Sequence, residues 1–237
     1  MILAGRVRLG DEVLDKPGRM LAEDAPLAVE DPNPFVSRGG VKLAHALTTF
    51  GVSATGKTAA DIGASTGGFT DCLLQNGAKK VYAFDVGYGQ LDWKLQSDDR
   101  VVLCDRFNAR HLKLEDVDGE AVGLAVIDVS FISLKLILPA VFAVMKEEGD
   151  LVALVKPQFE VGKDEVEHKG IIRDPAKHEK VLTDLTAFVV AQGWVACGLT
   201  ASPITGQKGN REYLLHCVAA GRGEAIEPAH ITKEVQA

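Results

Sequence analysis

The sequence predicts an α/β fold, in which a mostly parallel sheet of seven strands is covered by helices on both faces. From Lys57 onward, short apolar runs of strand length alternate with runs of helical spacing, a pattern typical of parallel strands joined by crossover helices. A glycine-rich turn at residues 60–70 joins one strand to a helix. Charged residues follow successive strands, at the sheet edge where ligands bind in open α/β folds.

The first 32 residues are predicted to form a small β appendage. Two short alternating runs lie between Arg6 and Gly18, and Leu27 to Val29 is a third candidate strand. Strands this short cannot hold a core of their own. A proline-containing linker, Asp31 to Pro34, follows them. We therefore expect one domain at residues 1–32 and a main domain at residues 33–220.

A helix is predicted from Ser37 to about Phe50. Ser37 is suited to cap its first turn, and the spacing of Leu43 and Leu47 gives the helix one apolar face. Lys42 lies near the start of this helix, where the helix dipole disfavours a cation. A solvated lysine and a functional lysine are both consistent with that position.

The alternating region is expected to contain seven strands and two further helices. The strands are predicted at residues 58–62, 80–84, 101–103, 123–127, 151–155, 194–200 and 212–218, and the helices at residues 68–75 and 176–192. Residues 221–237 are polar and are predicted to be a frayed tail.

The turn from Asp61 to Thr70 excludes two common ligand motifs by its spacing. Counted from Gly63, a dinucleotide fingerprint requires a glycine where this chain has Ser65. A P-loop requires Gly-Lys-Ser/Thr at its end, but Gly67 is followed by Gly68 and an aromatic residue. A glycine-rich turn without a ligand remains possible on this stretch alone.

Five charged residues follow successive predicted strands: Asp61, Asp85, Asp105, Asp128 and Lys156. One carboxylate in such a place can be a helix cap, but capping does not account for five in register. Asp85 lies where an acid accepts the ribose hydroxyls of a nucleoside, and Asp105 is placed to meet the base. The sequence therefore predicts a nucleoside cofactor.

Composition limits the functional class. The net charge of −7 argues against a broad nucleic-acid-binding face, although a local basic patch remains possible. The four cysteines form no Cys-x-x-Cys pair, which favours a reducing, cytoplasmic compartment and predicts no metal site. The longest apolar run, Leu136 to Met145, falls short of the roughly 20 residues that span a bilayer.

The chain resembles the TlyA group of the FtsJ-like ribose 2′-O-methyltransferases, whose members are sometimes labelled hemolysins. Five ordered motifs carry the resemblance: Val36–Leu43, Asp61–Thr70, Asp128–Leu134, Leu154–Glu160 and Ser202–Glu212. It implies a Rossmann-like methyltransferase fold, S-adenosyl-L-methionine (SAM) as cofactor, and ribosomal RNA or ribosomal subunits as partners. The N-terminal appendage resembles the closing half of an alpha-L RNA-binding domain without its first two helices.

The resemblance also implies a catalytic tetrad of Lys42, Asp128, Lys156 and Glu212. The implied reaction is in-line attack of a ribose 2′-hydroxyl on the methyl group of SAM, with Lys156 central and Asp128 orienting it. The resemblance implies a cytidine as the methylated nucleotide. Neighbouring carboxylates favour the charged form of a lysine. Two roles for Lys156 therefore stay open: a neutral base, or an ammonium that stabilises a developing alkoxide.

Further site residues follow from the same motifs. The expected cofactor-binding residues are Asp61, Gly63, Ala64, Ser65, Thr66, Gly67, Gly68, Phe69, Asp85, Asp105 and Asp128. Arg38, Arg110 and Lys163 are expected to form a basic rim for the substrate, and the loop Pro157–Lys177 is either a lid or a solvated loop. Two other hypotheses remain, a membrane-active haemolysin and a catalytically silent binding module. The oligomeric state is not predicted.

Overall fold

The computed structural model describes residues 7–10, 12–14, 16, 18–22, 24–29, 33–162, 170–206 and 209–236. Its contacts divide the chain into two compact units, Met1–Pro34 and Phe35–Ala237.

The first unit contains an antiparallel sheet of three short strands. β1 (Val7–Leu9) lies between β2 (Glu12–Leu14) and β3 (Leu27–Val29). Val7 and Leu14 are its buried apolar residues among those described. The predicted β appendage is confirmed, whereas its resemblance to an RNA-binding domain stays a prediction.

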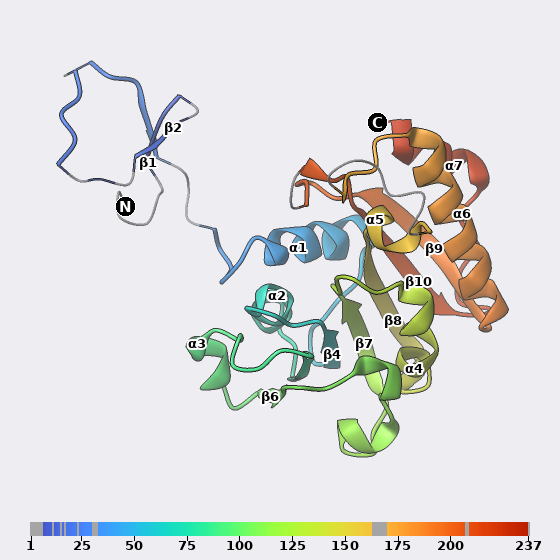
Figure 1. The fold of residues 1–237 in the computed structure, drawn as a ribbon. Coiled ribbons are helices and arrows are strands. Elements are labelled where there is room, and N and C mark those ends of the chain that lie inside the picture. The colour runs from blue at the N-terminus through green and yellow to red at the C-terminus, as the bar shows by residue number, and fades with distance from the viewer. Residues whose placement is uncertain are drawn as a thin grey trace. The chain divides into compact units, whose positions relative to one another are not determined.

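The second unit is built on a seven-stranded sheet in the order β6-β5-β4-β7-β8-β10-β9 (Figure 1). Its strands are β4 (Thr58–Ile62), β5 (Lys80–Phe84), β6 (Val101–Cys104), β7 (Val122–Ile127), β8 (Met145–Val155), β9 (Trp194–Ala201) and β10 (Tyr213–Ala219). The pairs from β6 to β8 are parallel, and β10 runs antiparallel to both β8 and β9. The predicted α/β fold with a mostly parallel sheet is confirmed.

Helices cover both faces of this sheet, and each face has its own apolar core. The helices are α1 (Gly39–Phe50), α2 (Gly68–Gln75), α3 (Trp93–Gln96), α4 (Leu138–Phe142), α5 (Pro157–Glu160), α6 (Pro175–Ala191) and α7 (Pro228–Gln236). Leu43 of α1 and Leu73 of α2 belong to one core cluster. Val141 of α4, Leu182 of α6 and Ile231 of α7 belong to the other. Both faces of the strands are therefore buried, as their nearly continuous apolar runs require.

The start of α1 differs from the sequence prediction. Arg38, not Ser37, occupies the N-cap position, and no side chain caps the helix there. The Ser37 hydroxyl instead packs against α2, because a Cβ atom added to Gly68 would lie 2.2 Å from Ser37 Oγ. The Ser37 side chain therefore packs between the start of α1 and the start of α2.

The C-terminal segment also differs from its prediction. Residues 228–236 form α7, where a frayed tail was expected. Ile231 and Val235 are buried on its inner side, and the carboxylate of Glu234 accepts the backbone N–H of Ala201 at 2.8 Å. Two buried apolar residues and this hydrogen bond therefore contribute to docking a mainly polar helix.

Candidate active site

A cavity of about 340 Å³ lies at the carboxyl ends of β4, β7 and β8. It is lined by Ser37, Arg38, Gly39, Lys42, Gly63, Ala64, Ser65, Thr66, Gly68, Phe69, Asp128, Ser130, Phe131, Lys156, Gln158, Phe159, Gly206 and Glu212. This is the edge at which open α/β sheets bind ligands. All four members of the predicted tetrad therefore lie on one cavity.

Lys156 and Asp128 of the tetrad form an ion pair at the ends of adjacent parallel strands. Lys156 follows β8 and Asp128 follows β7. Lys156 Nζ lies 2.6 Å from Asp128 Oδ1, and the lysine side chain is only 11% exposed. The ammonium also donates a hydrogen bond of 2.9 Å to Ser130 Oγ. These two contacts fix the ammonium at the cavity wall.

Lys42 and Glu212 of the tetrad form a second, more deeply buried ion pair. Lys42 Nζ lies 2.5 Å from Glu212 Oε2, with side-chain exposures of 11% and 3%. Glu212 immediately precedes β10, whose first residue, Tyr213, pairs with Val155 at the end of β8. Because β10 is antiparallel to β8, its beginning lies at the same edge as the end of β8. The reversed strand thus brings Glu212 to the cavity, and α1 brings Lys42.

The glycine-rich turn packs directly against the loop that carries Asp128. Gly63 has a φ of +87°, and a Cβ atom there would lie 2.4 Å from the backbone oxygen of Asp128. Only glycine tolerates both the conformation and the close approach. Gly63, Ala64, Ser65, Thr66, Gly68 and Phe69 all line the cavity, whereas Gly67 does not; Gly67 occupies the N-cap position of α2.

Asp61 is placed differently from its prediction as a cofactor ligand. It is fully buried, lies outside the cavity lining, and accepts a hydrogen bond of 2.6 Å from Thr70 Oγ1. Burial raises the pKa of Asp61 to about 7, although the hydrogen bond from Thr70 opposes the shift. Asp61 therefore ties the end of β4 to α2, and it supports the turn from behind.

The two acids predicted to hold a nucleoside do not line the cavity. The oxygens of Asp85 accept the backbone N–H groups of Ser65 at 2.8 Å and Gly87 at 2.7 Å. Asp105 accepts the backbone N–H of Gly89 at 2.9 Å. Because each carboxylate oxygen has two lone pairs, both acids keep the capacity to accept further hydrogen bonds.

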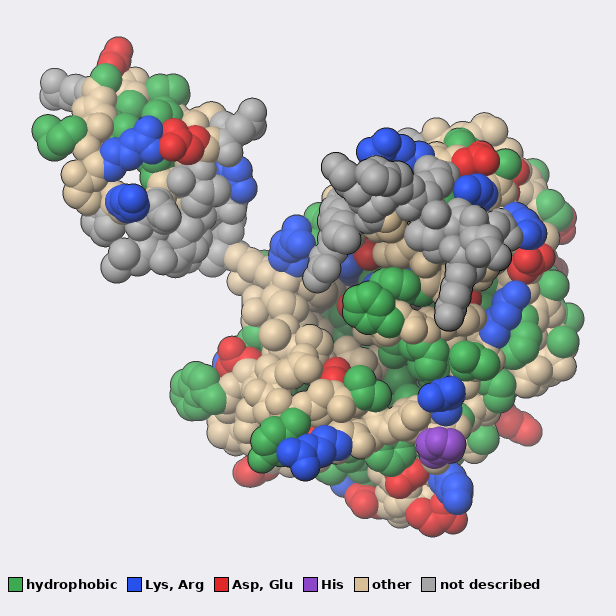
Figure 2. Space-filling model, viewed as in Figure 1, with side chains coloured by type: hydrophobic (Ala, Val, Ile, Leu, Met, Phe, Trp, Pro, Cys, Tyr) green, Lys and Arg blue, Asp and Glu red, His purple; other side chains and the backbone are tan. Residues whose placement is uncertain are grey.

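The predicted basic rim is only partly assembled. Arg38 is exposed and lines the cavity. Arg110 does not line it; this residue lies on the short helix Ala109–His111 and bonds to Asn108. Lys163 lies outside the described residues. On the face shown in Figure 2, basic side chains are scattered among acidic and apolar ones, as the net charge suggests.

Two aromatic residues and an amide at the cavity were missed by the sequence reasoning. Phe131 is 89% exposed, and its φ of +65° is unusual for a bulky residue. Its ring lies 5.0 Å from that of Phe159. Nearby, Oε1 of Gln158 is buried without a hydrogen-bond partner among the described residues. An exposed aromatic in a disfavoured backbone conformation indicates a function, but the sequence carries no signal for that conformation.

Among the described residues, no group of three His, Cys, Asp or Glu side chains is arranged to hold a metal ion. The same part of the chain contains no helix that combines the length and apolar character needed to cross a bilayer.

Sequence comparisons identify relatives across most of the chain. The FtsJ-like methyltransferase family model matches residues 35–218. The "Putative rRNA methyltransferase YqxC" of Bacillus subtilis is 51% identical over 94% of this chain and 80% of its own length. The 16S/23S rRNA (cytidine-2′-O)-methyltransferase TlyA of Mycobacterium tuberculosis is 43% identical over 91% of this chain and 81% of its own length. Hemolysin A of Brachyspira hyodysenteriae is also 43% identical, over 92% of this chain and 91% of its own length.

Solved structures give the same grouping. A "Putative hemolysin" from Streptococcus thermophilus superimposes with a TM-score of 0.86 and 45% identity, over 99% of this chain and 86% of that one. A magnesium protoporphyrin IX methyltransferase from Synechocystis, at 14% identity and a TM-score of 0.53 over 76% of this chain and 78% of that one, shares the fold alone. The family match, the close relatives and the cavity geometry agree: the chain belongs to the TlyA group of the FtsJ-like methyltransferase family.

Proposed function

We propose that this protein transfers a methyl group from SAM to a ribose 2′-hydroxyl of ribosomal RNA, on a cytidine. The observation that carries the proposal is the pair of lysine–carboxylate ion pairs on one cavity, next to the glycine-rich turn. The names of the relatives from M. tuberculosis and B. subtilis support the choice of ribosomal RNA.

The donor set around the glycine-rich turn fits SAM. The first N–H groups of α2 have no partner within the helix and suit a carboxylate. Asp85 retains acceptor capacity for ribose hydroxyls, and Phe69 lines the cavity with an apolar surface. When bound, SAM supplies an electrophilic methyl group attached to a sulfonium. We therefore assign the turn and Asp85 to the cofactor and leave the side with the tetrad to the RNA.

The tetrad would position the attacking hydroxyl and stabilise its developing charge. The ion pair between Lys156 and Asp128, with 2.6 Å between Nζ and Oδ1, supports the second role for Lys156, stabilisation of an alkoxide. Asp128 and Ser130 hold that ammonium in place, and the Lys42–Glu212 pair forms the adjoining wall. Fixed geometry of this kind accelerates a displacement mainly by orienting the reacting groups.

The proposal is tested by incubating the full chain with labelled SAM and three substrates: small ribosomal subunits, large ribosomal subunits and naked ribosomal RNA. We expect label at the 2′-oxygen of a cytidine in at least one substrate, located by nuclease mapping. Label on a base, on protein or in none of the three would overturn the proposal. Equal labelling of every RNA would remove the ribosomal specificity.

Replacing Asp85 with Ala is expected to weaken SAM binding by about 100-fold, because two hydrogen bonds to a charged acceptor contribute roughly 1.5 kcal/mol or more each. Calorimetric titration measures the affinity. Asp99, an exposed acid that does not line the cavity, provides a control, since Asp99→Ala should bind SAM normally. Unchanged affinity in a folded Asp85→Ala protein would contradict the assignment of the nucleoside site.

Replacing Phe131 with Ala is expected to lower kcat/KM for RNA by about tenfold to 100-fold, because an aromatic ring stacked on a base contributes roughly 1–3 kcal/mol. SAM affinity should not change, and Phe131→Trp should retain most activity. Trp93 is a matched control: it is 78% exposed and does not line the cavity. If Phe131→Ala behaves like Trp93→Ala, Phe131 does not contact the substrate base.

A further inference from the structure

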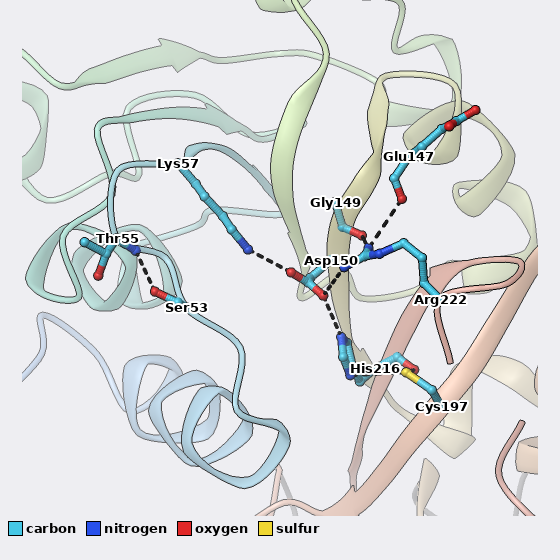
Figure 3. A network of polar contacts seen from close by, with 9 residues as sticks. All are labelled: Ser53, Thr55, Lys57, Glu147, Gly149, Asp150, Cys197, His216 and Arg222. Carbon is cyan, nitrogen blue, oxygen red and sulfur yellow. Dashed lines mark hydrogen bonds and ion pairs between the residues drawn. The ribbon is translucent and has the colours of Figure 1, made fainter. Parts of the chain in front are cut away.

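Outside the candidate active site, three neighbouring strands bring a carboxylate, an imidazole and a thiol into one row (Figure 3). Asp150 lies on β8, His216 on β10 and Cys197 on β9. His216 Nε2 lies 3.2 Å from Asp150 Oδ1, and His216 Nδ1 lies 3.3 Å from Cys197 Sγ. The imidazole therefore bridges the acid and the thiol through its two ring nitrogens.

A β-bulge creates this arrangement. His216 pairs with Gly198 and the next residue, Cys217, pairs with Ala196, so Cys197 is the extra residue on β9. In a regular strand, Cys197 would point to the opposite face from Gly198. The bulge redirects it toward His216, and bulges that re-aim a side chain are common next to functional sites.

The charged groups around His216 keep it protonated. Burial by itself lowers the pKa of His216, but the hydrogen bonds to Asp150 and Cys197 outweigh it and raise the pKa to about 9. Asp150 also forms ion pairs with two cations: its Oδ2 lies 2.7 Å from Lys57 Nζ, and its Oδ1 lies 3.7 Å from Arg222 Nη2. Although burial raises the pKa of Asp150, the hydrogen bonds from His216 and Lys57 lower it to about 2.

One face of the His216 imidazole is covered by an aromatic ring. Phe50, the last residue of α1, stacks on His216 with 5.4 Å between ring centroids. At neutral pH, His216 therefore has an N–H on each ring nitrogen: one donates to Asp150 and the other points at the sulfur. The N–H that points at the sulfur can stabilise negative charge on it when the sulfur acts as a nucleophile.

We propose that Cys197 is a reactive thiol and a site of oxidative modification by small hydroperoxides, with His216 as the proton donor and Asp150 as the positioning residue. The reagent must be small, because Cys197 is only partly exposed and lines neither the active-site cavity nor the cavities beside Lys135, His178 and Tyr82. This site is independent of the proposed methyl transfer.

With hydrogen peroxide, the reaction balances as follows. The thiolate attacks one peroxide oxygen, an S–O bond forms and the O–O bond breaks. Sulfur loses two electrons and becomes a sulfenic acid. The leaving hydroxide takes the Nδ1 proton of His216 and departs as water, so peroxide is reduced and His216 is left neutral.

The other three cysteines provide internal controls. Burial raises the pKa of Cys72 to about 12 and raises the pKa of Cys217 and Cys104 as well. None of these thiols has a histidine contact among the described residues. Buried thiols such as Cys72 and Cys217 are inert, whereas Cys104 is partly exposed but lacks such a histidine among the described residues.

The test labels the full chain at pH 7 with a brief pulse of isotopically coded iodoacetamide and reads each cysteine by mass spectrometry. We expect Cys197 to react at least about tenfold faster than Cys104, and Cys72 and Cys217 to remain unlabelled in the native state. An equimolar pulse of hydrogen peroxide followed by dimedone should tag Cys197 first. Equal labelling of Cys197 and Cys104 would overturn the proposal without any variant.

A pair of histidine variants tests the role of the imidazole. His216→Gln should slow the labelling of Cys197 by about tenfold, because the amide cannot supply the positive charge. His45→Gln is the matched control, since His45 is a partly buried histidine of α1 that bonds to threonines. If His216→Gln folds normally and Cys197 still reacts at the original rate, the contact between His216 and Cys197 is structural only.

Discussion

Replacing Lys156 with Ala is expected to reduce methyl transfer by about 10²-fold to 10⁴-fold, the range found when a group that stabilises transition-state charge is removed. The fold and the affinity for SAM should persist. Asp128, the partner that loses its cation, has 22% of its side chain exposed, although the oxygen that faces Lys156, Oδ1, is buried. The loss should appear in kcat, because Lys156 acts on the reacting hydroxyl in the proposed mechanism.

Two further variants sharpen this test. Lys156→Arg keeps a positive charge but cannot act as a neutral base, so residual activity above that of Lys156→Ala would support the electrostatic role. Lys79→Ala removes an exposed lysine away from the active-site cavity and should be fully active. Transfer of labelled methyl groups to ribosomal subunits is the measurement. An active Lys156→Ala enzyme would remove Lys156 from the mechanism.

The Lys42–Glu212 pair is expected to contribute to stability as well as to catalysis. Lys42→Met would leave the Glu212 carboxylate, which is 3% exposed, without a counter-charge, and breaking a buried pair in this way costs about 3–5 kcal/mol. The double variant Lys42→Met/Glu212→Leu should recover most of that loss, because no buried charge is left unpaired. Both proteins should be inactive if the pair belongs to the catalytic wall.

An exposed ion pair provides the comparison. Lys80 Nζ lies 2.6 Å from Asp118 Oδ2, with side-chain exposures of 33% and 68%. Lys80→Met should lower the free energy of unfolding by less than about 1 kcal/mol, as is usual for surface pairs. Urea unfolding of these three variants and of the unaltered protein measures the differences in the free energy of unfolding. Equal losses for Lys42→Met and Lys80→Met would show that burial of Glu212 is not costly.

The sequence predicted the positions of site residues that come directly after a strand. Asp128 and Lys156 could be brought together because the carboxyl ends of parallel strands share one edge of the sheet. Asp61 has the same signature but lies inside the protein, bonded to Thr70. Spacing alone does not distinguish a side chain that faces a ligand from one that supports the turn behind it.

Features that depend on exact register or on loop conformation were not accessible from the sequence. Cys197 and His216 meet only because of a one-residue bulge, and hydrophobic periodicity does not locate bulges. Phe131 reads in the sequence as an ordinary apolar residue, but its positive φ leaves the ring exposed. The docking of α7 depends on two buried residues, Ile231 and Val235, within a polar stretch.

Helix α1 is fastened at both ends to the same strand region. Near its start, Lys42 pairs with Glu212, just before β10, and at its end Phe50 stacks on His216 within β10. These two attachments are eight residues apart, or about 12 Å along a helix. The helix therefore acts as a strut that cannot slide or pivot past β10 without breaking an attachment. That wall of the cavity is set before any substrate arrives, and adaptation to the shape of an RNA falls to lining residues outside α1, such as the exposed Phe131.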